Sequence, residues 1–197
     1  MLPNKLDKRY WKRTFQATAQ NPDAWLINAS VLKKTADLII QQMKADENAE
    51  QVEIGWVDSV YKYLAGITIE NLLKGLIIAE CGVDLITKDE MDRTLTTHRP
   101  WTDHPDKLEF LQTLVTDDQK SLMKYLEPYV VWRGRYPVAK NAEQYANDTD
   151  EDGRVHLSLE KLESDFNALY ETLAKILSRK ATVYVETHRN NLPWFPM

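Results

Sequence analysis

Apolar residues recur every three or four positions along much of this chain, which is the spacing of one face of an amphipathic helix. One such segment starts at Asn21-Pro22, a capping residue followed by a proline suited to the first helical position. Its apolar positions are Trp25, Ala29, Leu32, Ala36, Ile39 and Met43. Another starts after Ser158, a plausible N-cap, and breaks only at Lys180. Its apolar positions are Leu159, Leu162, Phe166, Leu169, Leu173, Ile176 and Val183.

A central helix is predicted over residues 52–81, with Gly82 as its stop. Its first half is amphipathic, whereas its second half is apolar nearly all round. A helix of that kind lies in the middle of a bundle or at an oligomer interface. Its polar exceptions are Thr68, Glu70, Asn71 and Lys74.

Shorter elements complete the expected fold. A basic helix within an N-terminal extension, 1–21, is expected over residues 5–20, and Pro105 is expected to open a short helix after an irregular stretch at 83–104. A further helix is expected over 119–132, with Asp117-Asp118 as its cap and Pro128 as a kink or break.

Residues 134–157 are expected to form a polar loop, and 189–197 an extended tail. Glycine is scarce, at 6 residues, and no period repeats, so turn-rich β folds and solenoids are disfavoured. We therefore predict an all-α single domain over 1–197, an antiparallel helical bundle of four main helices with additional short helices.

The composition is that of an ordinary cytoplasmic protein, with 28% charged residues and a net charge of −5. Cys81 is the only cysteine, which excludes an intrachain disulfide and a zinc cluster built from cysteines. The N-terminus lacks the apolar core of a signal peptide, and the longest apolar run, 72–79, is interrupted by Lys74. No membrane attachment and no cofactor are expected.

The central helix resembles the signature helix of the HEPN superfamily. The matching residues are Ala65, Gly66, Ile69, Glu70, Leu73, Lys74, Leu76 and Ile77. Downstream, the run Arg135-Tyr136-Pro137 is similar to one found after the third helix in several HEPN branches. The order of the expected elements also fits, so the resemblance spans roughly residues 22–188.

This resemblance implies a small helical bundle, usually a homodimer. Many HEPN proteins are metal-independent ribonucleases of toxin–antitoxin and phage-defence systems, whereas others bind nucleotides or partner proteins without catalysis. The implied partners are therefore RNA or a nucleotide, and a cognate antitoxin or a nucleotidyltransferase-like protein. The implied function is a nucleotide-, RNA- or partner-binding module, with an endoribonuclease or a purely structural dimeric adaptor as alternatives.

The active HEPN branch carries Arg-x4–6-His near the start of a late helix, where Arg can hold a phosphate and His can transfer a proton. Two Arg-x4-His pairs occur here, Arg93 with His98 and Arg99 with His104. Both pairs lie in the irregular stretch, and Pro100 prevents a regular helix across the second pair. They are the catalytic candidates, although an interpretation as ordinary loop residues is favoured.

A basic and aromatic cluster at a predicted helix end is the best ligand-binding candidate. It consists of Trp132, Arg133, Arg135 and Tyr136 around Gly134, together with Lys140. Its guanidiniums could grip a phosphate, and its rings could stack a base. Gly134 as a helix cap with arginines at a helix C-terminus is the structural alternative. We expect this cluster to face a cleft beside Glu70 and Lys74.

Two groups of charged residues complete the candidates. Glu70 and Lys74 are four positions apart, which suits a self-neutralising pair inside a bundle more than a catalytic carboxylate. The aspartates of the acidic loop match the first half of a calcium-binding loop, but the twelfth position is Leu159 and not glutamate. A solvated acidic turn is favoured over a metal site at Asp148, Asp150 and Asp152.

Overall fold

The computed structural model describes residues 17–45, 51–81, 97–133 and 158–188. The predicted all-α class is confirmed, because these residues form helices and turns and no strand. The α-helices are α2 (Pro22–Ala45), α3 (Gln51–Cys81), α5 (Pro100–Asp103), α6 (Asp117–Pro128) and α8 (Leu159–His188). A 3-10 helix, Glu109–Leu111, precedes α6, and a π-helical segment, Tyr129–Arg133, follows it.

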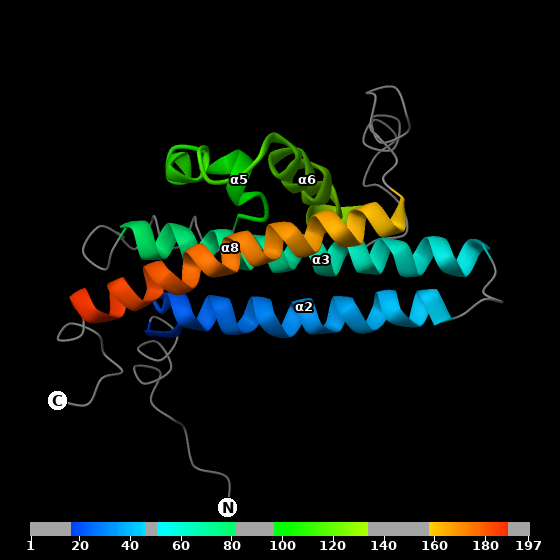
Figure 1. Ribbon diagram of the computed structural model, residues 1–197, viewed down its shortest axis with the longest axis horizontal. Helices are drawn as coiled ribbons and strands as arrows, with labels where there is room; N and C mark the ends of the chain where they lie inside the picture. The colour runs from blue at the N-terminus through cyan, green and yellow to red at the C-terminus, as the bar shows by residue number, and fades with distance from the viewer. Residues whose placement is uncertain (1–16, 46–50, 82–96, 134–157, 189–197) are drawn as a thin grey trace, which may run out of the picture.

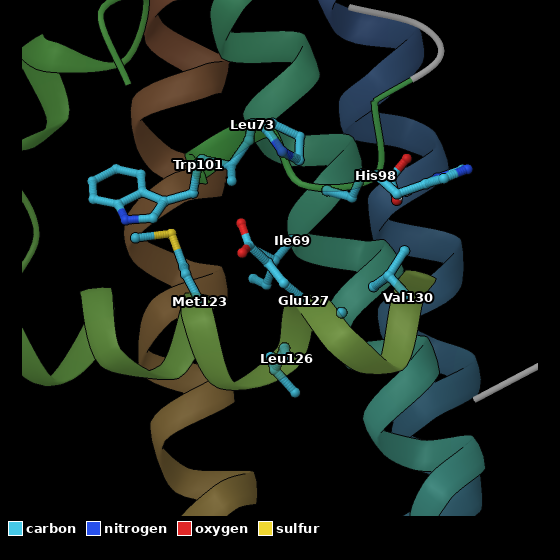
Figure 2. A pocket seen from close by; sticks show the side chains of 11 residues that line it. Ile69, Leu73, His98, Trp101, Met123, Leu126, Glu127 and Val130 are labelled. Carbon is cyan, nitrogen blue, oxygen red and sulfur yellow. Dashed lines mark ion pairs between the residues drawn. The ribbon is translucent and has the colours of Figure 1, made fainter. Parts of the chain in front are cut away.

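Three long helices form the body of the molecule (Figure 1). α2 and α3 run antiparallel side by side, and α8 packs on both while running in the same direction as α3. The shorter helices α5 and α6 lie on the side of α3 away from α2, and α6 runs across the long helices (Figure 2). α3 therefore touches every other α-helix of the described chain.

The central position of α3 confirms what its apolar second half indicates. Every residue from 68 to 78 is buried, including all four polar exceptions. The N-terminal part of the helix is less enclosed, since Val60 is 40% exposed. Helix α2 packs on α3, and its buried face includes the small side chains of Ala29 and Ala36 together with Ile40.

The buried face of α8 differs from the expected one in its second half. Leu162, Phe166, Leu169 and Leu173 are fully buried, as predicted. Beyond them the face continues through Leu177, Ala181 and Tyr184, whereas Val183 is 62% exposed. Val183 was predicted to lie on the buried face, and that prediction was wrong. Apolar residues three and four positions after Leu173 both fit one face of a helix, and the buried face continues through Leu177 and not through Ile176.

Two expectations around α6 also need correction. The N-cap is Thr116 and not Asp117-Asp118: the Thr116 hydroxyl accepts from Gln119 N at 3.2 Å, and the Gln119 side chain accepts from Thr116 N at 3.0 Å. This is a complete capping box. No regular α-helix follows Pro105, where turns flank the 3-10 helix.

The expected break at Pro128 is confirmed, because α6 ends there and the chain continues as the π-helical segment. Proline has no backbone N–H to donate to the preceding turn, which favours such a change. Of the N-terminal extension, residues 17–19 are helical. The remainder of the predicted helix 5–20, the loop 134–157 and the tail 189–197 lie outside the described residues.

Candidate functional site

A buried ion pair lies at the middle of α3. The Lys74 Nζ is 2.6 Å from Glu70 Oε1, and the two side chains are only 4% and 7% exposed. The Lys74 ammonium also lies 5.8 Å from the centre of the Trp25 ring of α2. The residues are one helical turn apart, so the backbone of α3 alone sets this pairing. Charges this deep require such a partner, because burial of either one alone is strongly unfavourable.

The second oxygen of Glu70 faces a histidine from a distant part of the chain. The His98 Nδ1 lies 3.4 Å from Glu70 Oε2, which is an ion-pair distance and longer than a well-formed hydrogen bond. Within the described residues, neither of these two atoms has a hydrogen-bond partner. The His98 side chain is 42% exposed, so the imidazole lies between the buried Glu70 carboxylate and the molecular surface.

Glu70 and His98 line a small pocket between α3, the turn around α5, and α6 (Figure 2). Trp101 and Met123 lie on one side of the view, and His98 and Val130 on the other. The cavity volume is about 10 Å³, close to the space that one water molecule needs. A nucleobase does not fit inside this pocket, so only its mouth, at the exposed edge of His98, is open to a large ligand.

A second carboxylate, Glu127 of α6, lines the same pocket. Burial raises the pKa of Glu127, while its hydrogen bonds from Thr102 and the charge of Arg99 act in the opposite direction. Asp103 adds a smaller contribution that raises the pKa. Glu127 was not among the sequence-based candidates. A signal was present, because Met123, Glu127 and Val130 share one face of a helical pattern and only Glu127 is charged.

The two Arg-x4-His pairs differ in where their described residues lie relative to the pocket. Arg99 and His104 flank the single turn of α5, and the Arg99 Nη2 lies 3.5 Å from Asp103 Oδ1 with its side chain 51% exposed. His104 is the C-cap residue of α5 and does not line the pocket, so this pair does not converge on it. His98 does line the pocket, whereas its sequence partner Arg93 lies outside the described residues.

The other sequence-based candidates fall largely outside the described part of the chain. Arg135 and Tyr136 lie outside it, as do Asp148, Asp150 and Asp152. The backbone of Trp132 and Arg133 belongs to the π-helical segment, but their side chains are not described. Within the described residues, no three histidine, cysteine or acidic side chains are grouped to hold a metal ion.

No described helix has both the length and the apolar character that crossing a membrane requires. Comparison of the chain with protein-family models, with curated proteins and with solved structures finds no match.

Proposed function

We propose that this protein binds RNA at the mouth of the His98 pocket and cleaves the phosphodiester backbone with His98 as the proton-transfer group. The observation that carries the proposal is the chain of contacts from Lys74 through Glu70 to the half-exposed imidazole of His98. A buried carboxylate behind a histidine can fix the orientation of the imidazole ring, which is an arrangement that general acid–base catalysis uses. The HEPN resemblance of the α3 segment supports the same proposal.

The proposed reaction is transesterification within the RNA. With the Nδ1 proton directed at Glu70, the His98 Nε2 accepts the proton of a ribose 2′-hydroxyl, and the 2′ oxygen attacks the adjacent phosphorus. The bond from phosphorus to the 5′ oxygen breaks, and the leaving oxygen takes a proton from a water molecule, which regains one from the His98 imidazolium. The products are a 2′,3′-cyclic phosphate and a 5′-hydroxyl. Arg99, which is half-exposed beside His98, contacts the phosphate.

The size of the cavity limits how RNA can bind. Because a base does not fit inside the pocket, the RNA backbone lies across its mouth, where the edge of His98 is accessible. Contacts to the phosphate and sugar carry little sequence information. We therefore expect weak base preference from this part of the chain.

The second candidate is a non-catalytic binding module for a partner protein, a second copy of this chain among the possible partners. Three large apolar side chains on α2 favour it. Ile27 is 64%, Val31 55% and Leu38 66% exposed within the described structure. Exposed apolar residues at helical spacing are typical of surfaces that another helix covers. The Arg99 guanidinium is also paired with the Asp103 carboxylate. This ion pair would have to break before Arg99 could contact a phosphate during catalysis.

One experiment separates the two functions. Purified protein is incubated with end-labelled RNA in EDTA, and the product ends are analysed for cyclic phosphate. We expect cleavage by the wild type and a loss of about 100-fold or more in His98→Ala, as for removal of a general base. His104→Ala is the matched control, because His104 shares the turn and not the pocket.

Two other results of this experiment would count against cleavage by His98. Cleavage that persists undiminished in His98→Ala contradicts the catalytic assignment. RNA that is neither cleaved nor bound, together with a stable complex in size-exclusion chromatography that Leu38→Lys disrupts, supports the partner-binding function. Thermal unfolding of each variant checks that the fold is intact.

A further inference from the structure

Thr102 joins the turn that carries His98 to α6 by two hydrogen bonds. Thr102 donates its backbone N–H to Glu127 Oε1 at 3.2 Å and its hydroxyl to Glu127 Oε2 at 2.7 Å. Both oxygens of this carboxylate are therefore engaged by one threonine, in a two-point contact that fixes direction as well as distance. We refer to Thr102 and Glu127 with these two hydrogen bonds as the Thr102–Glu127 clamp.

Hydrogen bonds and an ion pair connect the residues of the turn to one another. Arg99 N donates to Thr97 Oγ1 at 3.2 Å, and the Thr97 hydroxyl donates to Asp103. Asp103 N donates to the Arg99 carbonyl at 2.8 Å, and the Arg99 guanidinium pairs with the Asp103 carboxylate. Any change at Thr102 is therefore transmitted through Asp103 and Arg99 to the neighbouring His98.

Apolar packing alone leaves this unit some freedom. Pro100 and Trp101 are buried beneath the turn, but apolar contacts have no directional preference. Thr102 is on the exposed side of the turn, where the clamp supplies the directional bond to α6. The contact of His98 with Glu70 is already long, at 3.4 Å, so small shifts of the turn decide whether it tightens or separates.

We infer that Thr102 and Glu127 are positioning residues that hold the imidazole of His98 over Glu70. Neither residue needs to touch RNA. Their consequence for catalysis rests on the proposed function, whereas their effect on the geometry of His98 does not. A displacement of about 1 Å in a reacting group can cost about 100-fold in rate, so loss of one clamp bond is expected to lower kcat by about 10-fold.

The test compares Thr102→Val, which keeps the shape and the backbone N–H but loses the hydroxyl, with Thr102→Ser, which keeps the hydroxyl. Thr35→Val is the matched control, because the exposed Thr35 hydroxyl bonds only the Val31 carbonyl of its own helix. kcat and KM are measured with a defined RNA, and NMR follows the imidazole carbon-bound protons of His98 through a pH titration.

We expect Thr102→Val to lower kcat by about 10-fold, with little change in KM, and to shift the His98 signals. Thr102→Ser and Thr35→Val are expected to match the wild type in both measurements. Wild-type kcat and His98 signals in Thr102→Val would overturn the inference and leave the proposed function standing. If the wild type cleaves no RNA, the proposed function fails, and the NMR comparison alone decides the clamp.

Discussion

Glu127 is a charged residue at a position where its helix otherwise presents apolar side chains to the core. Its neighbours on that face are Met123 and Val130, and all three line the pocket. Burial of the Glu127 carboxylate raises its pKa, whereas its two hydrogen bonds from Thr102 act in the opposite direction. The protonation of Glu127 is therefore linked to the stability of the fold.

The contribution of Glu127 to the stability of the fold depends on pH. Because the pKa of Glu127 is raised in the folded state, the folded protein binds this proton more readily than the unfolded chain does. The contribution of Glu127 to the free energy of unfolding is therefore most favourable at low pH, and it falls as pH rises from about 4.5 through the folded-state pKa.

Glu127→Gln removes this dependence. We expect the variant to gain stability relative to the wild type as pH rises through this window, by less than about 1 kcal/mol because the carboxylate is partly solvated. Urea unfolding at a series of pH values measures the difference, with Glu171→Gln on the exposed surface of α8 as control. A constant difference between Glu127→Gln and the wild type across this range would contradict the prediction.

At the scale of elements, the close approach of α3 to the π-helical segment shapes the pocket. Gly66 of α3 faces Val130, and a Cβ atom at Gly66 would lie 2.4 Å from Val130 Cγ2 and 3.1 Å from the Leu126 carbonyl oxygen. The β-branched Val130 has little freedom to turn away, and the carbonyl belongs to the backbone. Only glycine therefore fits between these two elements.

We predict that Gly66→Ala destabilises the protein by about 1–3 kcal/mol, as overpacking does. At an exposed helical site the same change would stabilise by about 1 kcal/mol. Val130→Ala removes the closer of the two contacting groups, so the double variant should be more stable than the sum of the single effects. Chemical unfolding of the four proteins in this cycle measures the coupling; strict additivity would contradict the steric explanation.

Sequence patterns predict the long helices well because each pattern is local. Asn21-Pro22 starts α2, Ser158 precedes α8, and the apolar second half of α3 indicates its central place. The cap of α6 could also have been predicted, since Thr116 and Gln119 have capping-box spacing, but the adjacent aspartates are equally good caps.

The pocket could not be predicted in the same way. The distance from His98 to Glu70 depends on the path of an irregular stretch, and no periodicity describes that path. The Glu70–Lys74 pair was predictable because one helix contains both residues, and it is confirmed as a buried ion pair. The role of Thr102 requires the position of α6, which no local pattern contains.

At the scale of the whole molecule, α2, α3, α6 and α8 share one continuous apolar core. Phe166 of α8 is fully buried and meets the Tyr61 ring of α3 edge-on, with ring centres 6.1 Å apart, while Lys33 of α2 lies 5.4 Å from the Phe166 ring centre. Three helices thus meet at one side chain. A core of this kind favours unfolding in a single cooperative step.

We predict that Phe166→Ala lowers the free energy of unfolding by about 3–5 kcal/mol. Val183→Ala, on the exposed side of the same helix, should change it by less than about 0.5 kcal/mol. The helical circular dichroism and the NMR signals of His98 should be lost together during urea unfolding. Separate transitions for the two signals would show that the pocket and the long helices are not one cooperative unit.

The buried pair of Glu70 and Lys74 also restricts how this sequence can change over evolutionary time. Loss of either partner alone leaves an uncompensated charge in the core, at a cost of about 3–5 kcal/mol, which is a large part of the stability of a typical domain. Replacement of both by apolar residues of similar volume is close to neutral. Stability alone therefore lets descendants of this chain keep both residues or exchange both, so the two positions should covary when homologous sequences are compared.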